Sequence, residues 1–139
     1  MDRPDRLQRV EPSQSNRVPP RERFAPDAIQ FDLRMAAVQL DAEPDTGQFG
    51  HRQVALYKYE KATIALFRFE KGGSMQTHKA PGTVFIQVIE GKMTLDVSGT
   101  KHHLEAGGML VLAPGIQHDV QAEERSLMLL TICLGHEAR

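Results

Sequence analysis

The stretch that decides the fold runs from Gly72 to Gly91 and reads GGSMQTHKAPGTVFIQVIEG. Glycines bound it at both ends, and the apolar run Thr83–Ile89 between them is typical of a short β-strand. A second glycine-bounded stretch, Gly107–His118, reads GGMLVLAPGIQH and has a strand pattern over Met109–Leu112. Two such stretches with a short gap between them predict paired strands in one compact domain.

Short strands separated by turn residues fill the chain from Val54 onward. Met93, Leu95 and Val97 alternate with polar residues, which is the clearest pattern of a half-buried strand in the sequence. The other expected strands are Val54–Tyr59, Thr63–Phe69, Thr83–Ile89, Lys101–Leu104, Met109–Leu112, Asp119–Ala122 and Leu127–Cys133. About eight short strands with few helices predict an all-β fold, either a sandwich or a closed antiparallel barrel.

The first part of the chain has a different composition. Five of the eight prolines and six arginines fall in residues 1–28, where apolar side chains are too sparse for a packed element, so we expect a flexible tail there. Phe31–Leu40 has the spacing of a short amphipathic helix, and Asp41–Gly50 reads as a loop. The sequence therefore divides into a tail (1–28), a helix and loop (29–50) and a barrel domain (51–139).

Size and charge exclude several classes of function. With 139 residues, 40% of them hydrophobic, the chain suits one globular domain. Its formal net charge of -1 gives no field that would recruit nucleic acid or an anionic membrane. The lack of a secretory-type apolar segment and the single cysteine favour a cytoplasmic protein. That cysteine, Cys133, is expected to be a small apolar residue of a buried strand.

The two glycine-bounded stretches resemble the two sequence motifs of the cupin family. The residues at matching positions are Gly72, His78 and Gly91 in the first motif, and Gly107, Gly115 and His118 in the second. The resemblance covers Val54 to Cys133. It implies a cupin-type antiparallel β-barrel, the double-stranded β-helix or jelly roll, preceded here by a short N-terminal helix.

Several motif positions depart from the family pattern. In the family, two histidines and a glutamate of the first motif and one histidine of the second usually form a divalent-metal site. Here Ala80 stands at the second histidine position and Val84 at the glutamate position. Ala113 and Ala122 also replace the proline and the asparagine of the second motif. Of the implied ligand set, only His78 and His118 remain.

Two imidazoles alone hold a divalent ion weakly, because zinc sites normally use three protein ligands and non-haem iron sites use two histidines and a carboxylate. Regular strand alternation would put Gln76 on the face of His78, where its amide could add a neutral oxygen donor. The candidate metal ligands are thus His78 and His118, for one divalent ion such as Zn, Fe, Mn or Ni. The opposing interpretation is that both are hydrogen-bonded histidines of a decayed site.

The two histidines would face each other from separate strands, which predicts a shared cavity. Its expected lining residues are Gln76, His78, Ala80, Val84 and His118. The other histidines fall outside the motifs, and His102 and His103 are expected to be solvated. A neutral histidine pair in an apolar cavity could orient a small polar ligand or act as a general base.

Two functions remain open. The first is a small-molecule-binding cupin without strong catalytic apparatus, and the second is a divalent-metal-dependent enzyme of the dioxygenase, isomerase or epimerase type. The missing glutamate and second histidine favour the first. The expected partners are a small-molecule ligand and a second copy of the chain, with no nucleic acid and no membrane.

The homodimer is predicted from the distribution of large apolar residues. Strand parity that puts Val84 inside the barrel puts Phe85, Gln87 and Ile89 outside. An outward apolar face needs a cover, either the helix Phe31–Leu40 or a second subunit. We expect a two-fold homodimer whose contact includes Phe85 and the region before Val54.

Overall fold

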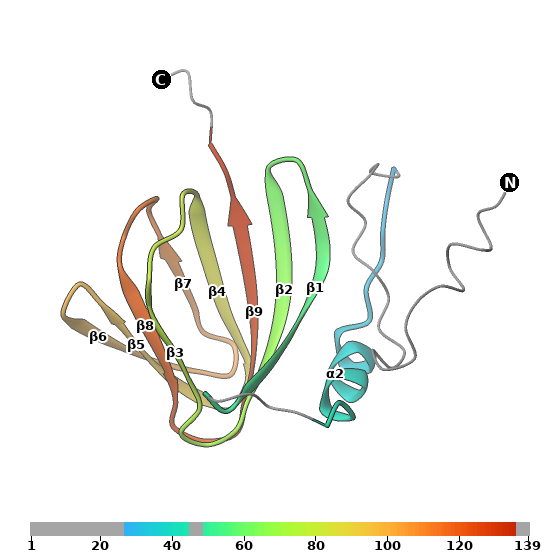
Figure 1. Ribbon diagram of the computed structural model, residues 1–139, viewed down its shortest axis with the longest axis horizontal. Coiled ribbons are helices and arrows are strands. Elements are labelled where there is room, and N and C mark those ends of the chain that lie inside the picture. The colour runs from blue at the N-terminus through green and yellow to red at the C-terminus, as the bar shows by residue number, and fades with distance from the viewer. Residues whose placement is uncertain (1–26, 45–48, 136–139) are drawn as a thin grey trace, which may run out of the picture.

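The computed structural model describes residues 27–44 and 49–135, and within these it leaves the side chains of residues 76–78 undescribed. In the part of the chain that the structure describes, nine antiparallel strands form two facing sheets (Figure 1). The five-stranded sheet has the order β1-β2-β9-β4-β7, and the four-stranded sheet the order β3-β8-β5-β6. The elements are α2 (Leu33–Asp41), β1 (His51–Tyr59), β2 (Ala62–Phe69), β3 (Ser74–His78), β4 (Thr83–Glu90), β5 (Lys92–Val97), β6 (Thr100–Glu105), β7 (Met109–Leu112), β8 (His118–Ala122) and β9 (Ser126–Cys133).

The predicted all-β jelly roll with a short helix is confirmed. Two strands differ from the sequence-based expectation. β1 begins at His51, three residues before the expected Val54, and β3 is a strand that the pattern of residues did not reveal. The expected tail lies almost wholly outside the described residues, and no helix among those described is long and apolar enough to cross a membrane.

The core lies between the two sheets, and β4 shows how the alternation of side chains builds it. Val84, Ile86 and Val88 are buried on the inner face, whereas the residues between them are only half-buried on the outer face. Burying each of these side chains contributes about 1.5–3 kcal/mol before the entropy of ordering is counted. The inner cluster also includes Phe67, Phe69, Met93, Leu95, Val120 and Met128.

The hairpin between β5 and β6 is closed by a two-residue turn. Ser98 and Gly99 both have positive φ, 49° and 92°, as the tight turns that match the twist of a hairpin require. The side chain of Asp96 supports the turn by accepting a hydrogen bond of 2.9 Å from the Gly99 amide. Local sequence therefore sets this connection.

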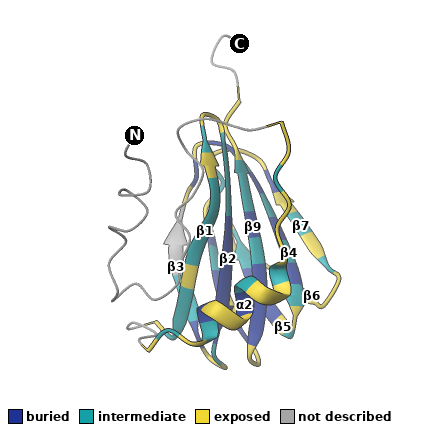
Figure 2. Ribbon diagram, turned by 90° about the vertical axis from the view of Figure 1, so that its right-hand side faces the viewer, coloured by how far each residue is buried: buried dark blue, intermediate teal, exposed yellow. Residues whose placement is uncertain are grey.

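Helix α2 begins where Asp32 caps it, accepting hydrogen bonds from the amides of Arg34 and Met35 at 3.0 and 3.1 Å. Such an N-cap stabilises a helix by about 1 kcal/mol. Its apolar side, Ala37 and Leu40, packs on the outer face of the five-stranded sheet against a second cluster that contains Leu66 and Leu127. Figure 2 shows α2 across the lower part of that face.

The expected burial of Cys133 is wrong. The thiol residue ends β9 and is exposed. In the register it lies opposite Ala62 of β2 and Thr83 of β4, at the end of the sheet, where no further strand residues follow to cover it. An apolar run predicts a strand, but not which of its ends the neighbouring elements bury.

Candidate functional site

The strand register brings His78 and His118 together. In the antiparallel pair β3–β8, His78 is the direct partner of His118. Directly opposed positions of two antiparallel strands share a face of the sheet. The backbone therefore pairs the two motif histidines, although they are forty residues apart in sequence.

His118 lies on the inner face of the barrel. His118 is 3% exposed. Its partner in β5 is Val97, which packs against the core. Its Nδ1 lies 3.2 Å from the carbonyl oxygen of Ile116. Because a carbonyl can only accept, this contact requires a proton on Nδ1. The hydrogen bond fixes the orientation of the imidazole on the inner face.

β3 does not alternate regularly. Met75 pairs with Val120 and His78 with His118, so two residues of β3 oppose the single residue Asp119 of β8. Because of this bulge, Met75 and His78, which are three positions apart, both pair with residues whose side chains are on the inner face, Val120 and His118. The regular alternation that would group Gln76 with His78 is thus broken. The contribution of Gln76 to the cavity stays a prediction.

Ala80 and Val84 are both buried, at 6% and 2% exposed, and both belong to the inner core cluster. Val84 pairs with Leu112 of β7 and Ile132 of β9, so it lies on an interior strand, near one end of the five-stranded sheet. These two apolar residues occupy the positions at which the intact motif would have metal ligands. That they line a ligand cavity together with the two histidines remains a prediction.

The inner face of β1 carries two polar residues that sequence reasoning missed. His51 and Gln53 oppose the core residues Phe69 and Phe67. The His51 ring lies 5.2 Å from the Phe69 ring centroid and 5.8 Å from that of Phe67. Its Nδ1 is 3.1 Å from the carbonyl oxygen of Ser74, and its Nε2 is 3.1 Å from Gln53 Oε1.

This histidine links the edge of one sheet to the edge of the other. The Ser74 amide also donates to the carbonyl of Phe49 at 2.8 Å, so both backbone groups of Ser74 are held at the start of β1. His51, Gln53 and Ala55 alternate along the sequence, and all three pair with core residues of β2. This alternation could have identified His51 and Gln53 as inner-face residues. It was missed because the strand was expected to begin at Val54.

Histidines 102 and 103 lie on opposite faces of β6. His102 pairs with the core residue Leu95 and is half-buried on the inner face, so the expectation that it is solvated is only partly met. His103 is exposed, as expected, and its Nδ1 lies 3.1 Å from Thr94 Oγ1 and 3.2 Å from Glu123 Oε2. Hydrogen bonds from Thr94 and His103 lower the pKa of Glu123.

The side chains that the structure describes do not supply a three-ligand metal site. Among the side chains that the structure describes, no group of three or more His, Cys, Asp or Glu residues could hold a metal ion. Ala80 and Val84, at the positions where the motif would supply ligands, have no donor atoms. His118 brings one imidazole to this region, and His78 is its partner in the register.

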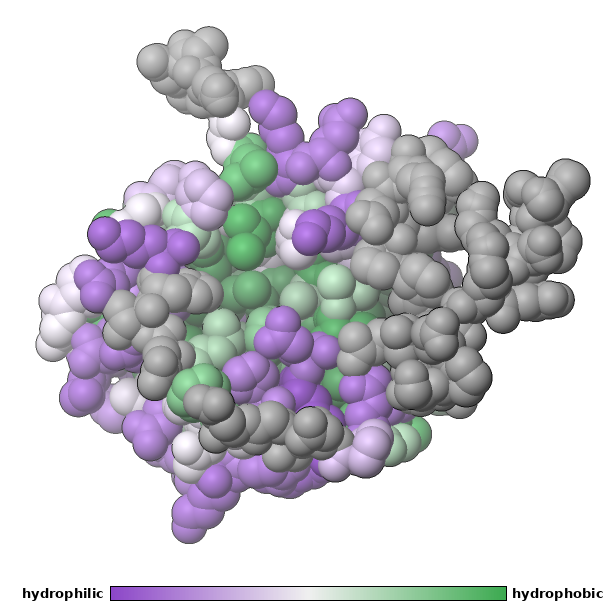
Figure 3. Space-filling model, in the orientation of Figure 1, coloured by the Kyte–Doolittle hydropathy of each residue, from purple (hydrophilic) through white to green (hydrophobic). Residues whose placement is uncertain are grey.

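Apolar side chains are exposed on the side of the molecule where the space between the two sheets faces solvent. Figure 3 shows hydrophobic side chains in the middle of the side on which Figure 1 draws β3 in front, with hydrophilic residues around them. Gln53 is exposed although its position is on the inner face of β1. The inner face is therefore accessible to solvent at the β1 edge.

Comparison with known proteins agrees with this architecture. A family model described as the cupin domain matches residues 65–133. A conserved protein of unknown function from Streptococcus pyogenes superposes with a TM-score of 0.63 and 21% identity, over 81% of this chain and 92% of that one. A cupin superfamily protein from Desulfitobacterium hafniense gives 0.61 and 20%, over 67% and 84%.

A larger protein is also similar in structure. Salicylate 1,2-dioxygenase from Pseudoaminobacter salicylatoxidans, solved as adducts with gentisate, has a TM-score of 0.60 and 19% identity, over 73% of this chain and 30% of its own. At these identities the likeness concerns the fold. No curated protein is significantly similar to this chain in sequence.

Proposed function

Because the chain belongs to the cupin superfamily, we propose that it binds a small polar molecule inside its barrel, in contact with His78 and His118. One observation carries the proposal: the register pairs these two histidines, and His118 is buried on the inner face with Nδ1 bonded to a backbone carbonyl. A ligand with hydroxyl or N–H groups would contact the imidazoles of these two histidines.

The surroundings support binding of a small molecule. Ligand sites in proteins are mostly apolar concave surfaces with a few placed polar groups. Here the inner face combines buried aliphatic and aromatic residues with His118, His51 and Gln53. A buried polar group that loses its hydrogen bond costs about 1–3 kcal/mol, so a ligand that enters this region has to keep these polar side chains paired.

The alternative is a divalent-metal-dependent enzyme of the dioxygenase, isomerase or epimerase type. The paired histidines favour it, since two imidazoles are the part of a metal site that this chain retains. The lack of a carboxylate at the motif positions opposes it, because a neutral ligand set attracts a cation less strongly. Metal content of the protein purified without added metal discriminates the two. Stoichiometric Zn, Fe, Mn or Ni that disappears in His78→Ala would favour the metal enzyme.

A thermal-shift screen tests the binding proposal directly. A ligand at one hundred times its Kd adds about 2.7 kcal/mol to the free energy of unfolding, which is readily seen as a rise in Tm. We expect small polar compounds to raise the Tm of the wild type and not that of His118→Ala. The matched control is His103→Ala, because His103 lies exposed on the outer face of the same four-stranded sheet, away from the core. A hit that stabilises His118→Ala as much as the wild type would contradict the site.

A further inference from the structure

A β-bulge near the end of β1 changes which residues reach the inside of the barrel. Ala55 pairs with Ala65, but Tyr57 pairs with Ile64, so two residues of β1 oppose one residue of β2. Regular alternation after Ala55 would put Tyr57 and Tyr59 on the inner face. The bulge instead gives that face to Lys58, which pairs with Thr63.

The position of Lys58 on the inner face follows from the register across the whole sheet. Its partner Thr63 pairs with Ile132, and Ile132 pairs with Val84, which in turn pairs with Leu112. Val84 and Leu112 are buried in the inner cluster, and Ile132 packs against it. Lys58 thus ends an inner-face row that contains Val84, one of the expected cavity residues.

Lys58 lies near the end of β1, next to the turn that joins β1 to β2. It is exposed, and so are Lys61, in the turn that follows β1, and Lys79, in the loop after β3. That loop is tied to the segment before His118 by a hydrogen bond of 2.9 Å from the Gly115 amide to the Ala80 carbonyl. The Leu134 amide donates to the Lys61 carbonyl at 2.8 Å, and Gly82, in the loop after β3, packs against the backbone of Cys133. The three lysines and the loops next to the two histidines therefore lie at the same end of the barrel.

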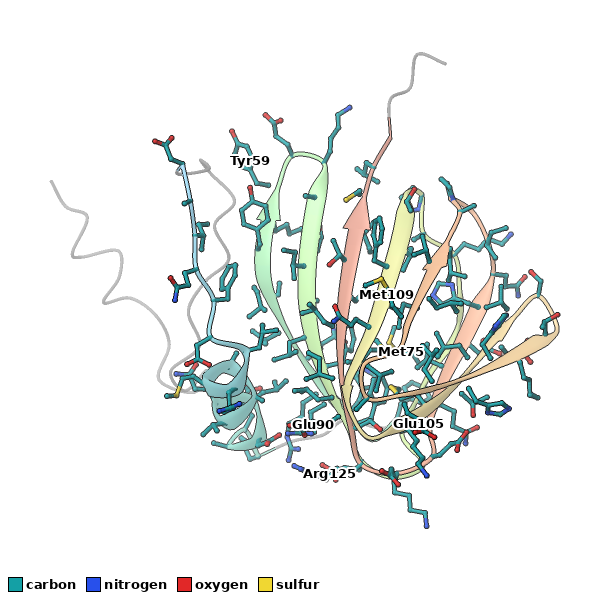
Figure 4. The ribbon with its side chains drawn as sticks, turned by 180° about the vertical axis from the view of Figure 1, so that it is seen from behind. Tyr59, Met75, Glu90, Glu105, Met109 and Arg125 are labelled. Atoms are coloured by element: carbon teal, nitrogen blue, oxygen red, sulfur yellow. The ribbon has the colours of Figure 1, made fainter. Side chains whose placement is uncertain are left out.

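The two ends of the barrel differ in how their charged side chains are paired. Among the described residues, no ion pair joins Lys58, Lys61 or Lys79 to a carboxylate, and the turn at this end contributes one acidic residue, Glu60. Figure 4 shows Glu90, Glu105 and Arg125 at the end away from Tyr59. There, Asp41, Glu70 and Glu90 are paired with Arg52, Arg68 and Arg125.

We propose that Lys58 is the anion-binding residue of the cavity and that the ligand is a small organic acid, held through its carboxylate. This inference rests on the proposed function, because it assigns the class of molecule that the cavity takes. The lysine stem can lie over the apolar inner face while the ammonium stays at the mouth, ready to pair with an arriving carboxylate. The polar remainder of the acid then points toward His118.

The experiment compares matched carboxylates and their neutral amides as probes, for instance benzoate with benzamide and lactate with lactamide, by thermal shift and calorimetry. The wild type should bind at least one carboxylate and not its amide, with an affinity that falls as salt is raised. Lys58→Gln should weaken that binding about ten-fold or more, as expected for the loss of a charge-assisted hydrogen bond. Lys58→Arg, which keeps the charge, should retain most of it.

Lys101→Gln is the control, because this exposed lysine pairs with Asp96 on the outer face of the four-stranded sheet. Equal affinity for a carboxylate and its amide, unchanged binding in Lys58→Gln, or no carboxylate bound at all would each overturn the inference. If neutral compounds bind in a way that depends on His118 and not on Lys58, the proposed function stands and the acidic ligand is refuted. If the protein binds neither neutral nor anionic compounds, both fail.

Discussion

Arg68 and Asp41 meet at the junction of the barrel with helix α2. The guanidinium donates from Nε to Asp41 Oδ1 at 2.8 Å and from Nη2 to Oδ2 at 3.1 Å, and its Nη1 lies 3.0 Å from Glu90 Oε1. The Arg68 side chain is 5% exposed, so this cation of β2 is nearly enclosed. Arg125 approaches the same carboxylate, with Nη2 at 3.4 Å from Asp41 Oδ1. The last residue of the helix is thus attached to the barrel by a charged contact as well as by apolar packing.

Asp41→Asn should destabilise the protein at pH 7 by about 2 kcal/mol, because it removes the charged partner of an enclosed arginine. Chemical denaturation followed by circular dichroism gives the free energy of unfolding. The control is Lys101→Ala, which removes an exposed ion pair and should change the free energy by less than about 0.5 kcal/mol. Equal effects of the two substitutions would contradict the structural role of the Arg68–Asp41 contact.

The same pair predicts how stability depends on pH. Burial raises the pKa of Asp41, but the hydrogen bonds and charge of Arg68, with those of Arg125, outweigh it and hold the pKa below its ordinary value of 3.8. The folded state therefore binds the proton later than the unfolded state as pH falls. The contribution of Asp41 is complete well above pH 3.8 and is lost as pH falls through the lower, folded-state pKa.

The free energies of unfolding of the wild type and Asp41→Asn should accordingly converge as the pH is lowered below 3.8. Denaturation curves at a series of pH values from neutral to acid measure the difference between the two proteins. A difference that stays constant over this range would show that Asp41 acts through its shape and neutral hydrogen bonds alone.

Two glycines with nearly the same backbone conformation provide a matched test of packing. Gly91 and Gly99 have φ values of 91° and 92°. A Cβ at Gly91 would collide with the Arg125 carbonyl oxygen and Ser126, whereas a Cβ at Gly99 meets no atom within 4 Å. Gly99→Ala should cost only the backbone strain of about 1–2 kcal/mol. Gly91→Ala should cost clearly more in the free energy of unfolding, and equal costs would mean that the neighbouring strand yields.

The outer face of the five-stranded sheet predicts the oligomeric state. Helix α2 packs on the part of this face that carries Leu66 and Leu127, whereas Phe85 belongs to neither apolar cluster. Its partner in β7, Val111, is 52% exposed, as is Met109. We expect a two-fold homodimer that covers these residues together with the region before Val54.

Light scattering coupled to size exclusion measures this assembly. The wild type should have twice the chain mass of 15.5 kDa, and Phe85→Glu should shift it toward the monomer. The control Thr94→Glu adds the same charge to the outer face of the other sheet and should leave the dimer intact. A wild-type monomer at micromolar concentration would refute the dimer.

Local patterns predicted the strands well because each strand is read from its own alternation. β7 was predicted with its observed bounds, and β4 and β5 within one residue at either end. The inward positions Val84 and Met93 also followed from parity within regular strands. Parity cannot be carried through β1 and β3 in the same way, because each contains a bulge and a shift of one residue exchanges the two faces of a strand.

By itself, then, the sequence determined an all-β barrel, the two glycine-bounded motifs and the loss of the motif's other ligand positions, because these depend on residue types and short spacings. Only the tertiary structure decided that His78 pairs with His118, that Lys58 replaces the two tyrosines on the inner face, and that His51 joins the two sheet edges. The physical reason is that bulges and sheet edges are set by the register between strands distant in sequence. That register is fixed by the summed packing of the core.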